Sequence, residues 1–369
     1  MTLGPLFSML GLGILAYRLA PVSFASKPRS EMAVSDTDSF TAGLVSIIIP
    51  ARNEAQNLPI ILASLTQLQY RDYEVIVVDD ASTDDTLSIA QMTASNDPHV
   101  RVLEAGEKPE GWVGKTWACQ QGAAVANGEW LLFTDADTEH MRSGLTRVMK
   151  RMSREKIDLL SAIPYHLEET FFDALMGPFH LMVLISSSAF SKPSPKRIFG
   201  IGQYLLFKRE YYIRQGGHEV VKGSFAEDQD FAVRCLALQG NYGLDRTGEV
   251  FGVRMYASAS EFLAGWRRIF RQGFPRASLA VAIEVFFILA CLTMSFHFAA
   301  AGVFEITMAL IGLTFLGFAQ KTYGQFSLVG LLTAPLSLGV FIVITALALF
   351  DLATGRDLRW RGRSYIIKK

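Results

Sequence analysis

The chain has 369 residues, half of them hydrophobic, and its 35 Lys and Arg residues balance its 35 Asp and Glu residues. Such a long and apolar chain is not a disordered one, and part of it is expected to face lipid or a large partner. The balanced charge argues against nucleic acid as a partner. Three well-separated cysteines, Cys119, Cys235 and Cys291, form no CxxC pair or disulfide framework and indicate a reducing compartment.

An apolar stretch opens the sequence. Residues 3–20 carry one charge, Arg18, and approach the roughly 20 residues that cross a bilayer. Basic residues follow this stretch and none precedes it, which favours a membrane anchor over residues 1–20 rather than a cleaved signal peptide. The GLG at 11–13 follows no strand and indicates a packing or flexibility feature, not a phosphate loop. Residues 21–43, rich in Pro, Ser, Asp and Thr, predict a linker.

Residues 44–275 have the composition of a soluble α/β domain. Four β-rich runs alternate with three helical patterns: strands are predicted at 45–50, 73–79, 99–105 and 129–135, and helices at 54–68, 84–94 and 116–127. This alternation predicts βαβ units and a mainly parallel sheet. Functional residues of such sheets gather beyond the carboxyl ends of the strands.

A semi-apolar segment at 171–190 interrupts this block. A membrane-crossing helix there would place the two halves of the domain on opposite faces of the bilayer. We therefore expect an amphipathic segment on the membrane surface, with an ordinary core helix as the alternative.

The C-terminal part is apolar again. Runs at about 279–297, 299–318 and 326–350 predict a transmembrane region over 276–350, followed by a basic tail at 351–369. The positive-inside rule favours an even number of spans, although there are three runs. Glu284 would be costly at mid-bilayer and places the first run partly in the interface, while Pro335 could break the last run. We expect a multi-pass protein of the cell membrane with its catalytic domain and tail in the cytosol.

Carboxylates follow two of the predicted strands. VIVV precedes Asp79 and Asp80, and LLFT precedes Asp135 and Asp137. Side chains two residues apart on a strand point the same way, so the second pair would repel unless a cation lay beside it. A diphosphate carried with Mg²⁺ or Mn²⁺ would supply that cation, because these ions bridge carboxylates to substrate phosphates. A DxD triplet alone is weak support, and its place after a buried strand strengthens it.

Four segments, in order and spacing, carry a resemblance to a known family. They are SIIIPARNE, VIVVDDASTDD, GWVGK with the later FTDADT, and FAEDQD, and together they resemble the inverting glycosyltransferases of family 2 over residues 45–275. GWVGK, the flanking apolar runs and the ending LRWRGRSY are most similar to the membrane-associated branch with carotenoid-acid (diaponeurosporenoate) and hopene-associated glycosyltransferases. The resemblance implies a GT-A nucleotide-diphospho-sugar transferase fold, Rossmann-like and mainly parallel, with N- and C-terminal transmembrane helices.

The resemblance also implies donor-side roles. Lys115 is expected near the sugar diphosphate, and Asp137, with Asp135 beside it, is expected to hold the metal. Asp135 also belongs to the residues expected to bind the nucleotide sugar, together with Pro50, Ala51, Arg52, Glu54, Asp79 and Asp80. Among the acids after the second strand, Asp80 is expected to contact the base or ribose first.

On the acceptor side, inversion at the anomeric carbon needs a base opposite the leaving group. The resemblance assigns this role to Asp228, with Glu227 beside it. Acceptor-side positions are expected at Gly200, Gly202, Gln203, Asp230, Trp266 and Arg268. The segment GWRRIFRQGF at 265–274 does not reproduce the QxxRW motif of processive members, so transfer of a single sugar is expected.

These expectations combine into one leading hypothesis. The chain would move a sugar from a nucleotide-diphosphate sugar, with a leaning to UDP-hexose, to a membrane lipid such as a carotenoid acid, hopanoid or other polyprenoid. A nucleotidyltransferase is an alternative, but PARNE lacks the glycines of its phosphate loop. A catalytically silent membrane scaffold with a GT-A fold is another, although such a descendant would be free to lose Asp137 or Asp228.

Overall fold

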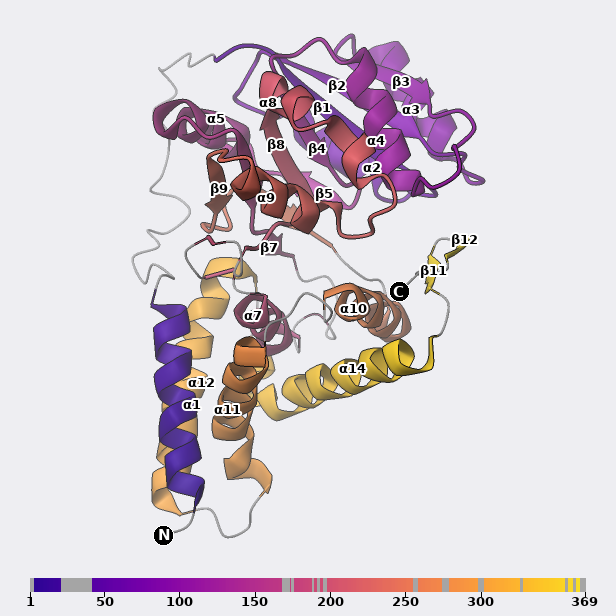
Figure 1. The fold of residues 1–369 in the computed structure, drawn as a ribbon. Coiled ribbons are helices and arrows are strands. Elements are labelled where there is room, and N and C mark those ends of the chain that lie inside the picture. The colour runs from indigo at the N-terminus through magenta and orange to yellow at the C-terminus, as the bar shows by residue number, and fades with distance from the viewer. Residues whose placement is uncertain are drawn as a thin grey trace.

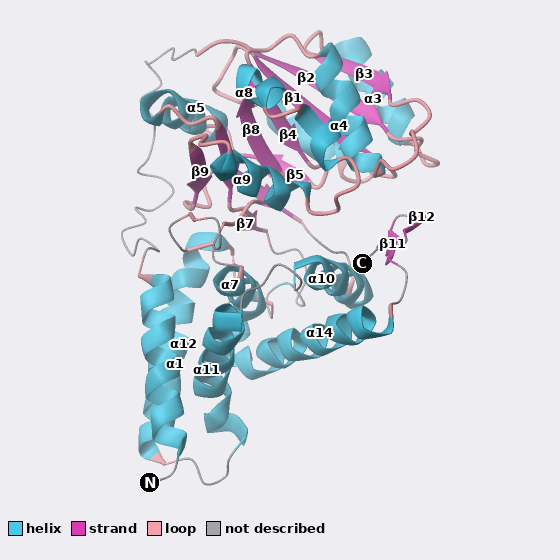
Figure 2. Cartoon of the chain, in the orientation of Figure 1, coloured by secondary structure: helices cyan, strands magenta, loops and turns pink. Residues whose placement is uncertain are grey.

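The computed structural model of the chain describes residues 3–20, 42–167, 173, 176–187, 189–190, 193–194, 198–254, 258–273, 279–297, 302–325, 328–355, 358–360 and 363–365. An α/β domain lies at one end of the molecule, and a group of apolar helices lies at the other (Figures 1 and 2). The linker predicted at 21–43 falls almost entirely outside the described residues.

A seven-stranded, mostly parallel sheet forms the centre of the α/β domain. Its strands lie in the order β3 (Val100–Glu104), β2 (Tyr73–Asp79), β1 (Val45–Ala51), β4 (Trp130–Thr134), β8 (Tyr204–Lys208), β6 (Leu159–Ala162) and β9 (Tyr242–Asp245). Only β8 runs antiparallel to its neighbours. The first four strands lie where they are predicted. Strands β1, β2 and β4 read as nearly continuous apolar sequence because they are buried on both faces, whereas only Val100 of β3 is buried.

Helices cover both faces of this sheet. The three predicted ones are α2 (Leu58–Leu65), α3 (Thr86–Asn96) and α4 (Gly114–Val125); the domain also contains α5 (Gly144–Glu155), α8 (Arg209–Arg214), η1 (Gly217–Val221) and α9 (Glu227–Ala237). The predicted helix at 54–68 is shorter in the structure because residues 52–57 form a turn in which Asn53 has a φ of 54°. A Cβ on Gly122 would lie 2.5 Å from Cγ2 of Ile48, so α4 packs directly on β1.

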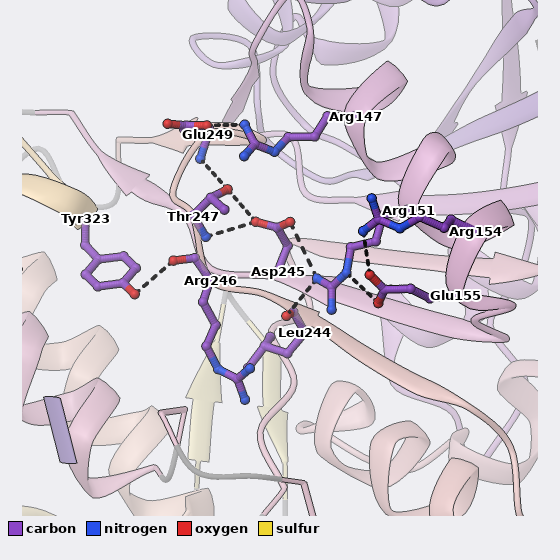
Figure 3. A network of polar contacts seen from close by, with 10 residues as sticks. All are labelled: Arg147, Arg151, Arg154, Glu155, Leu244, Asp245, Arg246, Thr247, Glu249 and Tyr323. Carbon is purple, nitrogen blue, oxygen red and sulfur yellow. Dashed lines mark hydrogen bonds and ion pairs between the residues drawn. The ribbon is translucent and has the colours of Figure 1, made fainter. Parts of the chain in front are cut away.

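A second, three-stranded sheet lies between the main sheet and the apolar helices (Figure 1). It consists of β5 (Thr138–His140), β10 (Phe251–Val253) and β7 (Tyr165–His166), with β10 in the middle. The loop between β9 and β10 is held by a polar network (Figure 3). In it, Asp245 accepts hydrogen bonds from the backbone and hydroxyl of Thr247, and Arg151 donates to the carbonyl of Leu244 at 3.0 Å.

The apolar helices form two groups. In the first, α1 (Leu3–Leu19), α11 (Leu279–His297) and α12 (Val303–Tyr323) pack along one another; we call these helices the three-helix bundle. The second contains α7 (Gly177–Ser186), α10 (Ala259–Gly273), α13 (Leu328–Leu332) and α14 (Ala334–Thr354), and the strands β11 (Leu358–Trp360) and β12 (Arg363–Tyr365) follow it. Within the described part of the chain, two helices, α12 and α14, are long and apolar enough to cross a membrane.

The structure modifies three expectations for the apolar segments. The run at 326–350 is divided into α13 and α14, and Pro335 lies in the first turn of α14, where its missing N–H breaks no helical bond. Within 171–190, the described helix α7 is buried along most of its length. This burial favours the core-helix alternative over an amphipathic segment on the bilayer surface.

An ion pair joins the N-terminal helix to the first C-terminal helix. Arg18, in the last turn of α1, is buried and donates from Nε to Oε2 of Glu284 at 2.7 Å. Glu284 lies in the second turn of α11, so the pair sits at the ends of both helices that face the α/β domain. The cost expected for a lone carboxylate in an apolar helix is therefore offset by a basic partner.

Close contact between α1 and α11 depends on Gly11, as the sequence interpretation of GLG expected. A Cβ at this position would lie 2.1 Å from the carbonyl oxygen of Phe287 and 2.6 Å from Cβ of Cys291. A Cβ on Gly13 would meet nothing within 4 Å.

We predict that Gly11→Ala lowers the midpoint of thermal unfolding of the detergent-purified protein, because the new methyl group forces the two helices apart. Overpacking of this kind typically costs about 1–3 kcal/mol. Gly13→Ala, two residues away on the same helix, is the matched control and should leave the midpoint unchanged or raise it slightly. Equal midpoints for the two variants would show that α1 does not pack on α11 as described.

Candidate active site

The acids that follow β2 and β4 lie at the same edge of the main sheet, as predicted, because these strands are parallel to β1. Strand β1 lies between β2 and β4, with Ala51 beside Asp79 and Ile48 beside Phe133. Asp79 ends β2, and Asp135 directly follows the end of β4. Strand β8 is antiparallel to β4, so its beginning brings residues 202 and 203 to the same edge.

Two loops meet on the nucleotide side of this edge. Nη1 of Arg52 donates to the carbonyl oxygens of Asp80, at 2.5 Å, and Ala81, at 3.1 Å. Asp79 is buried, and its Oδ2 accepts the N–H of Ser82 at 3.1 Å. Its Oδ1 is also buried and has no hydrogen-bond partner among the residues that the structure describes. An unsatisfied buried carboxylate oxygen is costly, which marks this position as a place for a donor from a ligand.

Three other residues expected on the nucleotide side contribute mainly to the loop itself. The carboxylate of Glu54 accepts a hydrogen bond from Asn57 at 2.8 Å, and its N–H donates to the hydroxyl of Thr86 at 2.8 Å. Ala51 is buried, and its carbonyl oxygen accepts the N–H of Asp80 at 2.8 Å. Pro50 is half-buried at the end of β1. Their contacts hold the two loops together, and direct binding of a nucleotide by them stays a prediction.

The ammonium group of Lys115 joins three segments that are far apart in sequence. Its Nζ lies 2.8 Å from Oδ1 of Asp135 and 2.8 Å from Oε1 of Glu227. Lys115 comes from the first turn of α4, Asp135 from the end of β4 and Glu227 from the first residue of α9. We call these residues, with Gly202 and Asp228, the Lys115 cluster.

Asp228 is the second carboxylate of α9, and backbone N–H groups hold it in place. Its Oδ2 accepts the N–H of Gly202 at 2.8 Å, and its Oδ1 accepts the N–H of Gln229 at 2.7 Å. A Cβ at Gly202 would lie 2.9 Å from Nζ of Lys115 and 3.1 Å from Oε1 of Glu227. Glycine at this position therefore allows the loop before β8 to approach both charged groups.

The charges in the Lys115 cluster move its pKa values in different directions. Burial, and next the charge of Glu227, raise the pKa of Asp228 to about 7, although Lys115 opposes the rise. Burial also acts to raise the pKa of Glu227, but Lys115 outweighs it and the pKa is lowered. Burial acts to lower the pKa of Lys115, whereas Asp135 and Glu227 raise it well above its usual value. Asp228 is thus the member that changes charge near neutral pH.

Asp137 lies on the same turn as Asp135, on the side of α2 and β10. Its Oδ1 is 3.5 Å from Nε2 of Gln203, and its carbonyl oxygen is 3.5 Å from the N–H of Arg254. Among the described residues, no three His, Cys, Asp or Glu side chains are grouped to hold a metal ion. The carboxylates of Asp135 and Asp137 offer hard oxygen ligands, which suit Mg²⁺ or Mn²⁺ when a diphosphate completes the coordination.

The remaining acceptor-side expectations have different outcomes. Asp230 lies in the first turn of α9, where it accepts a hydrogen bond from the hydroxyl of Ser224. Trp266 is buried on α10, and its ring packs against Phe179 and Phe270, with centroids 5.1 and 6.0 Å apart. These contacts make Trp266 part of the packing of α10 on α7 and not of the Lys115 cluster. Arg268 lies half-buried on the same helix.

Two buried residues behind the Lys115 cluster carried no sequence signal. The hydroxyl of Tyr212 and Nδ1 of His218 are 2.9 Å apart, and the His218 ring packs on Phe133, with centroids 4.6 Å apart. Burial lowers the pKa of His218 to about 3, so this ring is neutral. The pair packs against Phe133 near the end of β4. Neither residue belongs to a sequence motif that would have predicted this role.

We predict that Asp228→Asn stabilises the folded protein more at about pH 8.5 than at about pH 5.5. A carboxyl group whose folded pKa is raised binds its proton more tightly in the folded state, so stability falls as the pH rises through about 7. Removing the charge should recover up to roughly 2 kcal/mol between these two pH values. Thermal unfolding at both values measures this difference, with the exposed Asp85→Asn as the control for loss of one acid. A gain that is the same at both pH values would contradict the raised pKa.

Comparisons with known proteins agree with this geometry. The model of glycosyl transferase family 2 matches residues 46–216. A 4,4'-diaponeurosporenoate glycosyltransferase of Staphylococcus aureus (strain MRSA252) is 27% identical over 362 residues, which cover 92% of this chain and 93% of the relative. The protein of the same name from Staphylococcus haemolyticus (strain JCSC1435) is 28% identical over 348 residues, covering 89% and 90%.

A solved structure shares the whole architecture. It is a mannosyltransferase from Pyrobaculum calidifontis in complex with GDP-Man and Mn²⁺, with a TM-score of 0.54 at 18% identity, covering 94% of this chain and 99% of that one. At this identity the likeness shows the fold alone. The match of residues 46–216 to family 2, the two relatives and the shared GT-A fold together support a glycosyltransferase.

Proposed function

We propose that this glycosyltransferase moves a single sugar from a nucleotide-diphosphate sugar to a membrane lipid, with inversion at the anomeric carbon. The observation that carries the proposal is the position of Asp228, which is held by two backbone N–H groups beside the Lys115–Glu227 ion pair and has a pKa of about 7. A base with a pKa near the working pH combines a large ionised fraction with useful proton affinity.

The reaction needs few steps from the chain's own residues. The acceptor oxygen attacks the anomeric carbon while the bond from that carbon to the diphosphate oxygen breaks. The acceptor proton passes to the carboxylate of Asp228, and the nucleoside diphosphate leaves. Glu227 keeps its charge and holds Lys115 in place, so that the ammonium group lies beside the site where negative charge develops. Gly202, Gln203 and Asp230 line the acceptor side of this arrangement.

The donor would bind along the loops after β1 and β2. Oδ1 of Asp79, buried without a partner, is suited to an N–H of the base, while Asp80 and Arg52 flank the ribose. A uracil base, as in UDP-hexose, presents one such N–H. The Pyrobaculum calidifontis structure contains GDP-Man, and a guanine base also presents N–H donors. Asp79 therefore supports a nucleotide with an N–H on its base edge.

Asp135 and Asp137 would hold the divalent metal, Mg²⁺ or Mn²⁺. When bound, such an ion neutralises charge on the departing diphosphate. The mannosyltransferase structure contains Mn²⁺, which supports a metal-assisted reaction here. Lys115, paired with Asp135, would be the fixed positive charge on the other side of this carboxylate.

The acceptor is proposed from the relatives and from the apolar helices. Both Staphylococcus relatives are named for 4,4'-diaponeurosporenoate, a carotenoid acid, and they match nearly the whole chain. A carotenoid acid, hopanoid or other polyprenoid would remain in the bilayer while its polar end reaches the site. These features support an enzyme of the cell membrane, for which we propose a multi-pass topology with residues 44–275 as a cytosolic catalytic domain. The glycosyltransferase assignment leaves the nucleotidyltransferase and silent-scaffold alternatives without support.

We predict that Asp228→Asn abolishes sugar transfer but retains nucleotide binding, because the amide cannot accept the acceptor proton. Transfer from UDP-glucose or GDP-mannose to membrane lipid extract, and binding of the nucleoside diphosphate by calorimetry, separate the two effects. The wild-type rate should rise with pH through about 7, where Asp228 loses its proton. Asp85→Asn should behave as wild type, and loss of binding together with transfer in Asp228→Asn would point to a structural role.

We further predict that Asp137→Asn weakens dependence on Mn²⁺ and reduces transfer by at least about a hundredfold, since the charge on the leaving diphosphate is then poorly neutralised. The rate is measured against Mn²⁺ concentration for wild type and variant with the same donor. Addition of EDTA should reduce wild-type transfer to a similar level. An unchanged rate and unchanged Mn²⁺ dependence in Asp137→Asn would remove the metal assignment.

A further inference from the structure

Helix α14 is highly apolar but lies across the direction of the three-helix bundle (Figure 1). Its mean hydropathy is 2.3, compared with 1.6 for α12, and both helices have 21 residues. Sequence alone would therefore assign both to the membrane. Helices that cross one bilayer run within about 40° of its normal. Helices α1, α11 and α12 share one direction and pack together, whereas α14 packs on α10 and α7.

The distribution of basic residues supports a crossing by the three-helix bundle. No Lys or Arg occurs in the sequence from residue 277 to residue 320, which includes all of α11 and most of α12. Arg18 and Lys321 lie at the ends of α1 and α12 that face the α/β domain. Basic residues stay on the cytosolic side of a membrane, so the far end of the bundle is the side that was translocated.

Both ends of α14 are fixed on the side of the α/β domain. Before it, the last residue of α12, Tyr323, donates its hydroxyl hydrogen to the carbonyl of Arg246 at 2.9 Å (Figure 3), and Gly324 bridges to His166 of β7. After it, Asp351 in the last turn of α14 accepts two hydrogen bonds of 2.5 Å from Arg267 of α10. The chain therefore enters the segment that leads to α14 from the domain side, and the end of α14 is bound to α10 on that same side, so α14 does not need to cross the bilayer.

We propose that α14 lies along the bilayer on the domain side, below α10, and makes contact with lipid acyl chains without crossing. Its outward side chains are large and apolar: Leu336, Val343 and Phe350 are 58%, 53% and 51% exposed. The opposite face, with Leu338, Phe341 and Ile344, is buried. An exposed apolar face of this length is unfavourable in water and favourable against lipid acyl chains.

Helix α10 separates α14 from the aqueous domain and suits the headgroup layer. Its buried residues Phe262, Trp266 and Phe270 form one face, and Arg267 and Arg268 are half-buried beside them. Apolar residues on one face with arginines beside them are typical of a helix at the interface of an anionic bilayer. In this arrangement only α11 and α12 cross after the catalytic domain, so the basic tail returns to the domain side. Three apolar runs then give two spans, because the third run, which contains α14, does not cross. Two spans are the even number that the basic tail requires.

The first test determines on which side α14 ends. Single cysteines are introduced as Thr354→Cys at the end of α14, Gly302→Cys before α12 and Ser95→Cys on α3, all at exposed positions. A membrane-impermeant maleimide is applied to sealed vesicles of both orientations. Because Cys119, Cys235 and Cys291 are buried, the wild-type chain provides the background labelling. Thr354→Cys and Ser95→Cys should be labelled in the same vesicles, and Gly302→Cys in the opposite ones. Labelling of Thr354→Cys together with Gly302→Cys would overturn the proposal.

The second test measures depth along the helix. A fluorophore is attached to single cysteines at 336, 343 and 350 in vesicles of phosphatidylcholine and phosphatidylglycerol brominated at the chain end or near the headgroup. If α14 lies in the plane of the bilayer, the ratio of quenching by the chain-end bromine to quenching by the bromine near the headgroup should be the same at all three positions. The matched control on α12, with cysteines at 303, 310 and 318, should show a deep middle position between shallow ends. If the middle position of α14 were also deeper than its two ends, α14 would cross the bilayer and the proposal would be wrong. The proposal would also be wrong if lipid did not quench any of the three positions and the protein were a dimer in detergent, since a second copy would then cover this face.

Discussion

The ammonium group of Lys115, held between two carboxylates, is the interaction on which the site depends. Its two contacts of 2.8 Å join the beginning of α4, the end of β4 and the beginning of α9. Without a cation there, Asp135, Glu227 and Asp228 would gather three negative charges at one edge of the sheet, which is unfavourable in a buried setting. Within this cluster Lys115 lowers the pKa of Glu227, whereas burial and the charge of Glu227 raise the pKa of Asp228.

Two carboxylates of the site, Asp228 and Asp79, lower the stability of the folded protein. A carboxyl group with a pKa near 7 destabilises the folded state whenever it is ionised, and a buried Oδ1 of Asp79 without a partner adds to that cost. Folding alone would favour an apolar or amide side chain at both places. Groups of this kind are found where a ligand or a proton must be received. The seven-stranded sheet supplies the rigidity that keeps them in position.

The sequence predicts the parts of this protein that follow from local pattern. Three buried strands are visible as apolar runs and a fourth as a β-rich run, and the acids after β2 and β4 could be brought together because parallel strands end at one edge. The partner of Glu284 could not be predicted, since Arg18 is 266 residues away. Trp266 resembled an acceptor-side residue by position, but only the packing of α10 on α7 shows that its ring is buried elsewhere. Hydropathy likewise predicts that α14 is apolar, but it does not predict the direction of α14 relative to the three-helix bundle.

The catalytic edge and the apolar helices are connected by the small sheet β5–β10–β7. The turn with Asp135 and Asp137 continues into β5, and His166 of β7 stacks on His180 of α7 with ring centroids 4.0 Å apart. Helix α7 in turn packs on α14, with the N–H of Phe179 donating to the hydroxyl of Ser337 at 2.9 Å. In the arrangement proposed above, these packed elements would set the depth of the site relative to the bilayer. For a polyprenoid acceptor this matters, because withdrawing its chain into water costs about 0.8 kcal/mol for each CH₂. Holding the site at the surface where the polar end of the lipid emerges removes the need for extraction, so the binding energy can be used to orient the acceptor oxygen.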